Sequence, residues 1–197
     1  YCLIKAYWRI QAARGKAPKI EEDGGTILNF GNGAAWQAFL QGEEKGDDWE
    51  LDGIKLSPDW LRDNLYIEVK STSAYPSTKA EPIEEERVLK NETWMRQAMA
   101  YAYVQNYQHV YPKGESPQAE YPFGLAVIHD MGFQKTLRFW KLEFIGAELM
   151  ANWRWGLARR DILQAALDKS QSPGLEWGEA WECKNCPLKG SRCVGKE

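Results

Sequence analysis

The amino-acid sequence predicts a mixed α/β protein in which a small mixed sheet is flanked by helices. Segments with apolar residues at helical spacing alternate along the chain with segments in which apolar and polar residues alternate, in the order helix, strands, helix, strands, helix. The 197 residues suffice for one hydrophobic core but are few for two, and no linker-like stretch divides them. We therefore expect a single domain over residues 1–197.

Each element follows from a local pattern of apolar residues. Helices are predicted over residues 3–13, 34–41, 84–109 and 147–168, and strands over residues 49–52, 65–70, 123–129 and 136–144. The turn-rich residues 57–64 separate the first two strands, and a turn at 130–134 makes the last two a hairpin. In the second helix we expect Ala35, Phe39 and Leu40 to point inward.

The sharpest local feature is an acidic pair with a lysine beside it. Asp59 follows a proline in the turn before the 65–70 strand, and Glu68, Val69 and Lys70 lie within that strand. Because side chains at i and i+2 share a face of a strand, Glu68 and Lys70 project together. Two converging carboxylates suit Mg²⁺, and a lysine beside them can orient or deprotonate a water and offset phosphate charge. A cross-strand ion pair beside a routine turn is the alternative interpretation.

The helix that follows adds two polar residues on one face. Gln97 and Tyr101 are four residues apart and can therefore reach the same point. A tyrosine in an amphipathic helix more often packs in the core. Trp94 and its apolar neighbours are assigned to that core, which leaves Gln97 without an obvious buried role.

Four cysteines lie at the two ends of the chain: Cys2, Cys183, Cys186 and Cys193. The C-terminal three can direct their sulfurs at one point, and Cys2 is the remaining cysteine that can complete a tetrahedral zinc site or an iron–sulfur cluster. His109 and His129 are read as structural. Spacing alone leaves zinc and iron–sulfur both open.

The series Pro58-Asp59, Glu68-Val69-Lys70 and Gln97-x-x-x-Tyr101 resembles the PD-(D/E)XK nuclease superfamily in its RecB-like branch. The resemblance implies a restriction-endonuclease-like core and a metal-dependent deoxyribonuclease. Asp59, Glu68 and the backbone carbonyl of Val69 would ligate Mg²⁺ or Mn²⁺, and Lys70 would orient or activate the water. Gln97 and Tyr101 would brace the site and touch the DNA strand.

The cysteine arrangement resembles the iron–sulfur members of that branch, above all the stand-alone CRISPR-associated RecB-like exonucleases and their phage or viral relatives. The resemblance implies a 4Fe–4S cluster held by all four cysteines, which joins the ends of the chain, residues 1–20 and 177–197. It also implies action on single strands or DNA ends. The partners would be CRISPR integration proteins in antiviral defence, or recombination proteins in phage or repair DNA processing.

One position departs from the family pattern. Most iron–sulfur members carry a metal-binding histidine before the first strand, whereas the corresponding position here is Ala35 or Trp36, and neither can bind a metal. A catalytically weak or inactive DNA-binding or partner module of the same fold is therefore an alternative. A zinc-stapled structural protein is a second alternative.

The charge is unevenly distributed along the chain. The net charge of −3 argues against coating nucleic acid by bulk electrostatics. However, residues 1–20 carry +5 and residues 183–197 carry +3, so the intervening segment carries −11. A cluster that joined the ends would merge them into one basic patch, whereas separate solvated ends are the alternative.

Two further expectations concern location and the ten tryptophans. The sequence has no apolar run of about 20 residues and no signal-peptide pattern, so we expect a cytoplasmic protein without a membrane span. Trp60, beside Asp59, is a candidate for stacking on unpaired bases, as are Trp177 and Trp181. Packing in the core is the alternative for each of them.

Overall fold

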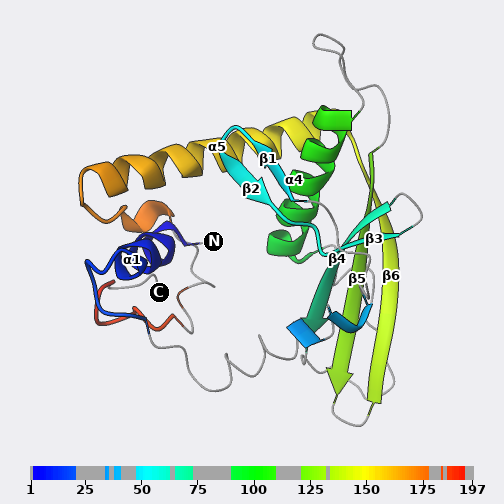
Figure 1. Cartoon of the computed structure of the whole chain (residues 1–197), viewed down its shortest axis with the longest axis horizontal. Helices are drawn as coiled ribbons and strands as arrows, with labels where there is room; N and C mark the ends of the chain where they lie inside the picture. Colours follow the sequence, from blue (N-terminus) through cyan, green and yellow to red (C-terminus); the bar gives the residue numbers. More distant parts are fainter. Residues whose placement is uncertain are drawn as a thin grey trace. The chain divides into compact units, whose positions relative to one another are not determined.

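The computed structural model describes residues 2–20, 34–35, 38–40, 48–62, 65–72, 90–109, 121–131, 134–177, 183 and 186–193 (Figure 1). The chain divides into two compact units. One contains Tyr1–Ile27 together with Trp155–Glu197, and the other contains Leu28–Arg154. The units are described in turn, beginning with the one that contains the predicted acidic pair.

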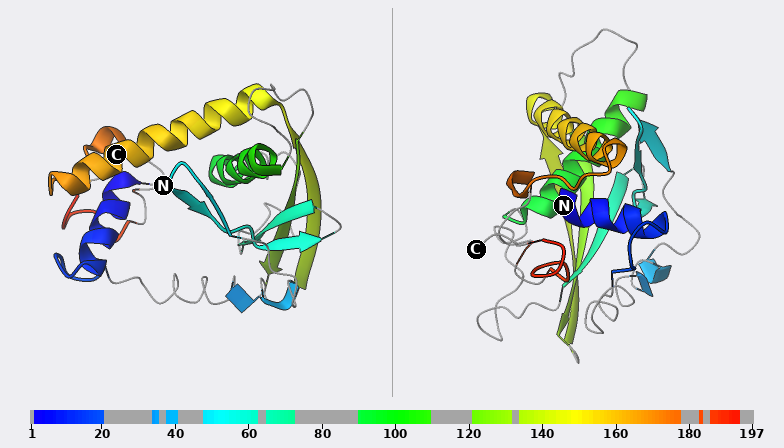
Figure 2. Two further views of the ribbon diagram at one scale, coloured as in Figure 1. Left: turned by 45° about the horizontal axis from the view of Figure 1, so that its top comes forward. Right: turned by 90° about the vertical axis from the view of Figure 1, so that its left-hand side faces the viewer.

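A four-stranded sheet in the order β3-β4-β5-β6 forms the centre of this unit. The strands are β3 (Trp60–Arg62), β4 (Leu65–Thr72), β5 (Tyr121–Met131) and β6 (Gln134–Phe144). The central pair β4–β5 is parallel, and the two outer pairs are antiparallel. Helix α4 (Glu92–His109) connects the parallel strands and lies along one face of the sheet (Figures 1 and 2). The predicted mixed α/β fold with a small mixed sheet is thus confirmed.

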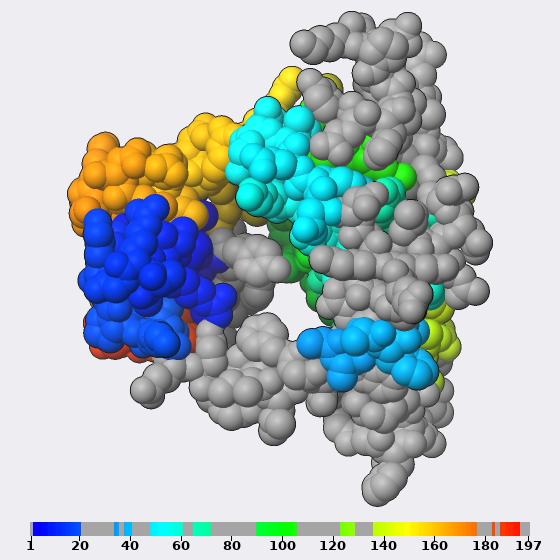
Figure 3. Space-filling view, in the orientation of Figure 1, coloured from blue at the N-terminus to red at the C-terminus, as the bar shows by residue number. Residues whose placement is uncertain are grey.

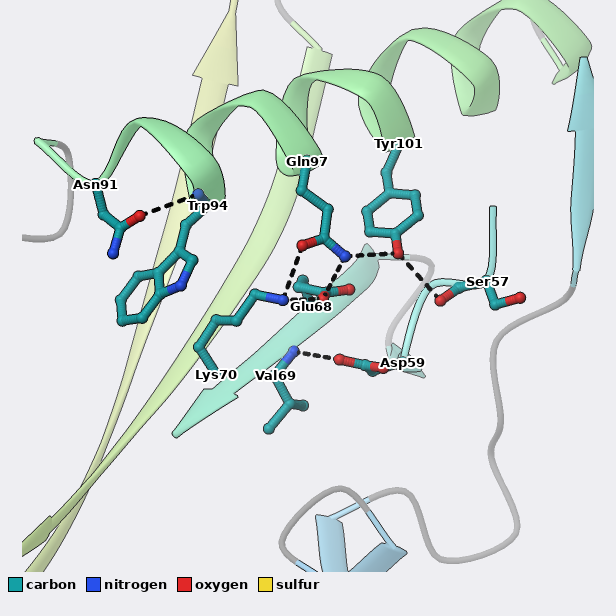
Figure 4. Close-up of polar contacts among 9 residues, drawn as sticks. All are labelled: Ser57, Asp59, Glu68, Val69, Lys70, Asn91, Trp94, Gln97 and Tyr101. Atoms are coloured by element: carbon teal, nitrogen blue, oxygen red, sulfur yellow. Dashed lines mark hydrogen bonds and ion pairs between the residues drawn. The ribbon is translucent and has the colours of Figure 1, made fainter. Parts of the chain in front are cut away.

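The two faces of β4 are chemically distinct because its side chains alternate. Ile67 packs in a buried cluster with Trp60 and Ala126, and Val69 contacts the same cluster. Glu68 and Lys70 point to the opposite face, toward α4 (Figure 4). The strand therefore secures itself to the core with one face and presents its polar pair with the other.

Strand β3 corrects the prediction of a turn over the whole of 57–64. Trp60 to Arg62 pair antiparallel with β4, with Trp60 opposite Ile67. Burial of the Trp60 side chain, which is 5% exposed, favours strand pairing over the turn composition of the segment. Trp60 lies in the core, so it does not offer its indole to an unpaired base.

A separate hairpin precedes the sheet. Strands β1 (Trp49–Leu51) and β2 (Ile54–Leu56) pair with each other through a turn in which Asp52 and Gly53 have φ of 51° and 74°. This left-handed pair is typical of tight hairpins. The Asp52 carboxylate accepts a hydrogen bond of 2.9 Å from the indole N–H of Trp153, which anchors the turn.

Two predicted helices differ from the observed ones. Helix α4 begins at Glu92, where the side chain of Asn91 accepts the N–H of Trp94 at 3.2 Å and caps the helix, and residues 84–89 of the predicted helix lie outside the described residues. In the segment predicted as helix 34–41, residues 34–35 and 38–40 are helical. Phe39 is 76% exposed and Ala35 is exposed, so the inward face was wrong, and Leu40 alone of the three packs against the sheet cluster.

The second unit combines both ends of the chain. Its first helix, α1 (Leu3–Ala13), has the predicted bounds and buries Tyr7 against the end of α5 (Gly146–Asp168). The short 3₁₀ helix η1 (Leu175–Trp177) also contacts α1. Residues at both ends of the chain therefore belong to one body (Figure 3). None of the helices in the described ranges is long and apolar enough to span a bilayer.

Candidate active site

Glu68 and Lys70 form the centre of a polar network between β4 and α4 (Figure 4). Glu68 is 3% exposed, and its Oε1 forms an ion pair with Nζ of Lys70. The same Nζ donates to Oε1 of Gln97 at 2.9 Å. The i, i+2 spacing on the strand places both charges on one face, as predicted, and that face meets α4.

Gln97 and Tyr101 complete this network from the helix. Nε2 of Gln97 donates to Oε1 of Glu68 at 2.7 Å and to the hydroxyl of Tyr101 at 2.9 Å. The Tyr101 hydroxyl donates in turn to the backbone carbonyl of Ser57 at 3.2 Å. Hydrogen bonds therefore connect Lys70 continuously to the loop that precedes β3.

Asp59 enters from that loop, two residues after Ser57. Its Oδ2 accepts the backbone N–H of Val69 at 2.8 Å, which holds the carboxylate against β4 between the positions of Glu68 and Lys70. In Figure 4 it lies on the opposite side of Glu68 from the helix. The turn that the sequence places before β4 thus delivers a second carboxylate to the first.

The electrostatics of Glu68 are unusual for a carboxylate. Burial, reinforced by the negative charge of Asp59, raises its pKa to about 7 despite the opposing effect of Lys70. Its Oε2 is buried and has no hydrogen-bond partner among the described residues. Burial and the nearby Glu68 charge also raise the pKa of Tyr101. A buried, unpaired carboxylate oxygen beside a second carboxylate is a favourable place for a cation.

Aromatic side chains fix Tyr101 in place. Its ring stacks on Phe123 with centroids 5.4 Å apart and meets the edge of Trp49 at 6.2 Å. Trp49 in turn packs edge-on against Tyr66 at 4.5 Å. All four are buried, so the hydroxyl group of Tyr101 is held by a rigid apolar surround.

The oxygen donors fit a hard divalent cation that retains several waters. Asp59, Glu68 and the carbonyl oxygen of Val69 would hold Mg²⁺ or Mn²⁺, and two carboxylates are a normal protein contribution for such ions. Within the described ranges, no three His, Cys, Asp or Glu side chains gather closely enough to form a metal group on their own. The predicted set depends on two carboxylates and a backbone carbonyl.

The four cysteines all belong to the unit formed by the chain ends. None forms a disulfide; Cys2 and Cys183 are buried, and Cys186 and Cys193 are half-buried. Arg192, next to Cys193, places its guanidinium 5.2 Å from the ring centre of Trp8 and donates to the carbonyl of Pro18 at 3.1 Å. These contacts join the cysteine-rich segment to Trp8 of the first helix and to Pro18 beyond it. The thiol donor set suits iron–sulfur or zinc, and the cluster stays a prediction.

Some predicted positions lie elsewhere, and one residue was missed. Trp36, Trp181 and the side chains of His109, His129 and Trp177 lie outside the described part of the structure. Trp94, assigned to the core from sequence, is half-buried, and its side chain extends from α4 toward the Lys70 side of the network (Figure 4). Its spacing of three from Gln97, which places both on one helical face, is the signal that could have found it.

Comparisons with known proteins add little to this geometry. The chain matches no family model and no curated protein. A solved structure titled "Crystal structure of SSO0001" aligns with 15% sequence identity and a TM-score of 0.45, covering 100% of this chain and 83% of that chain. At this level the likeness carries no argument. The fold and the site themselves define a mixed α/β protein with a partly buried network of carboxylate, lysine and amide.

Proposed function

We propose that this protein is a DNA nuclease that hydrolyses phosphodiester bonds with Mg²⁺ or Mn²⁺. The observation that supports this most is the buried Glu68, a neighbour of Asp59, which pairs one oxygen with Lys70 and leaves the other without a hydrogen-bond partner among the described residues. A protein rarely buries a carboxylate with an unpaired oxygen unless the carboxylate has a functional role. A phosphodiester substrate explains why a lysine and two carboxylates should share one point.

The chain's own residues have distinct roles in this reaction. When bound, the divalent ion supplies positive charge to the phosphate oxygens and makes water more acidic. Asp59, Glu68 and the Val69 carbonyl would hold it. Lys70, kept in place by Gln97, orients the attacking water or removes its proton and offsets the charge that develops on the phosphate. Water adds to phosphorus, an ester P–O bond breaks, and the leaving oxygen takes up a proton.

Gln97 and Tyr101 act on the geometry of the site. Gln97 bonds simultaneously to the carboxylate and the ammonium group, so it fixes the distance between them. Tyr101 ties the network to the Ser57 carbonyl and so to the loop that carries Asp59. We expect such positioning to affect the cleavage rate, because small displacements of reacting groups raise the activation barrier. As the family resemblance implies, both side chains would also touch the DNA strand.

The proposal includes a structural 4Fe–4S cluster on Cys2, Cys183, Cys186 and Cys193. The support is the set of four thiols without a disulfide, in a unit where the first helix contacts the cysteine-rich segment through Arg192. The substrates would be single strands or DNA ends. The partners would be CRISPR integration proteins or recombination proteins, in the cytoplasm.

The test is degradation of a single-stranded oligonucleotide in Mn²⁺ by the wild type, Glu68→Ala and Lys70→Ala. The chain offers a matched control in Lys141 and Glu143, which form a 2.8 Å ion pair at the same i, i+2 spacing on β6 but are solvent-exposed. We expect the first two variants to lose at least 100-fold in rate, as removal of a charged group at a reacting centre generally does, and Glu143→Ala to retain the wild-type rate.

Two outcomes would change the proposal. Equal degradation by the wild type and both site variants would show that a contaminant or another site does the cutting. Metal-independent DNA binding without any cleavage would favour the inactive binding module, which the absence of a metal-binding side chain at Ala35 motivates.

A further inference from the structure

Trp94 lies on the same helical face as Gln97 and Tyr101, in the first turn of α4. Asn91 accepts its backbone N–H at 3.2 Å, so the start of the helix is fixed at this residue. Figure 4 shows the indole extending from the helix toward the Lys70 side of the network. The residue is half-buried, so part of its surface is accessible.

This indole differs from the tryptophans that build the core. Trp49, Trp60 and Trp153 are 5%, 5% and 4% exposed, and each contacts another aromatic ring. With the described residues, by contrast, the Trp94 indole makes no ring contact and no hydrogen bond. Packing of the helix is already provided by Ala98 and Ala102, both fully buried. Among the described residues, the Trp94 ring therefore has no partner in stacking or hydrogen bonding, and the half-buried residue keeps part of its surface exposed.

We propose that Trp94 stacks on an unpaired base of the nucleotide whose phosphate lies at Glu68 and Lys70, which makes it a specificity-determining residue. The inference rests on the proposed nuclease function and deepens it. Every base offers a π-face, so stacking on an indole tolerates any sequence. Inside a duplex both faces of a base are covered by its neighbours. An indole at this position consequently selects single strands and frayed ends over intact duplex.

The closing experiment measures binding rather than turnover. Fluorescently labelled single-stranded oligonucleotides are titrated with a Glu68→Gln protein, which is expected not to cut them, and with the same protein carrying Trp94→Leu or Trp94→Phe. Leucine preserves apolar packing but cannot stack, whereas phenylalanine retains a smaller ring. We expect about 10-fold weaker binding for Trp94→Leu, a typical loss for one stacked base, and a loss of about threefold or less for Trp94→Phe.

Two controls separate stacking from a general effect. On an oligonucleotide in which abasic positions replace the bases, Trp94→Leu and its parent should bind equally, because no base remains to stack. Trp155→Leu, which removes another exposed indole, on α5, should leave binding unchanged. Melting temperatures of the variants show whether each one folds, and Trp94→Phe keeps the test valid if the leucine variant does not.

The possible outcomes test the stacking role of Trp94 separately from the proposed nuclease function. Equal binding of normal oligonucleotides by Trp94→Leu and its parent overturns the stacking role, while loss of cleavage in Glu68→Ala would leave the nuclease proposal intact. A 10-fold loss that persists on the abasic oligonucleotide also overturns it, because the effect would not involve bases. Absence of both DNA binding and cleavage in the wild type overturns both proposals.

Discussion

The amide of Gln97 bridges the two charged groups of the site. Its Nε2 donates to Oε1 of Glu68 at 2.7 Å, while its Oε1 accepts from Nζ of Lys70 at 2.9 Å. A neutral amide can donate to a carboxylate through its N–H and accept from an ammonium group through its oxygen at the same time. The two partners therefore fix the orientation of the Gln97 amide, and the amide in turn fixes the position of Glu68 relative to Lys70.

Replacement of Gln97 by glutamate should disable the site while preserving the size of the side chain. The variant loses the N–H donors to Glu68 and Tyr101 and brings a second carboxylate against a buried one. Hydrogen bonds to charged groups contribute about 1.5–3 kcal/mol, so we expect kcat/KM for single-stranded DNA to fall by roughly 10- to 150-fold. Measurement of cleavage rates at several substrate concentrations checks this.

A matched control exists on the exposed surface of α5. Gln164 also donates to a carboxylate, that of Asp168 at 2.7 Å and four residues away. Gln164→Glu should therefore keep wild-type kcat/KM. If Gln97→Glu keeps more than half of that value, the bridging amide has no role in catalysis.

Tyr101→Phe should weaken both stability and activity. The phenylalanine ring keeps its contacts with Phe123 and Trp49, but the Ser57 carbonyl and Gln97 lose a hydrogen-bond partner. We expect the free energy of unfolding to fall by about 1 kcal/mol, measured by urea denaturation, and kcat/KM to fall by about 10-fold as the Asp59 loop loosens. Tyr7→Phe, in the other unit, is the activity control. Unchanged activity in Tyr101→Phe would mean that the tether to Ser57 does not position Asp59.

The sequence predicted the parts of the site that depend on local spacing. Glu68 and Lys70 share a strand face because they are two residues apart, and Gln97 and Tyr101 share a helix face because they are four apart. Periodicity fixes such relationships regardless of what the rest of the chain does. For the same reason the bounds of α1 were predicted correctly.

The parts that were missed depend on partners distant in sequence. The strand at Trp60 exists because β4 and β5 bury its side chain, and the turn-rich composition of the segment does not reveal them. The hydrogen bond from Tyr101 to Ser57 joins residues 44 positions apart. Periodicity places Trp94 on a helical face but does not say whether that face meets the core or the site. Likewise, nothing local shows that Phe39 points outward.

The nature of the cysteine site has a direct spectroscopic test. Protein purified without oxygen should be brown and absorb broadly in the visible range, because an iron–sulfur cluster absorbs there and Zn²⁺, a d¹⁰ ion, does not. Cys183→Ser, which removes a buried thiol, should lose the colour and lower the melting temperature. Ser191→Ala, in the same segment, should keep both. A colourless wild type that contains stoichiometric zinc would establish the zinc alternative.

The raised pKa of Glu68 makes the stability of the metal-free protein depend on pH. The carboxyl group has a pKa of about 7 when folded, against an ordinary value of 4.5. Between these values the folded state keeps a proton that the unfolded state has lost, so the free energy of unfolding should decrease as the pH rises from about 4.5 to 7 and level off above it. The full effect is roughly 3 kcal/mol.

Urea denaturation in a chelator should therefore show Glu68→Gln, which does not titrate, gaining stability relative to the wild type over this interval, whereas the exposed Glu143→Gln gains none. Mn²⁺ should restore the free energy of unfolding of the wild type above pH 7, since a bound cation compensates the negative charges of Asp59 and the ionised Glu68. Parallel pH profiles for the wild type and Glu68→Gln would mean that Glu68 is already ionised in the folded protein at low pH, and that Lys70 outweighs its burial.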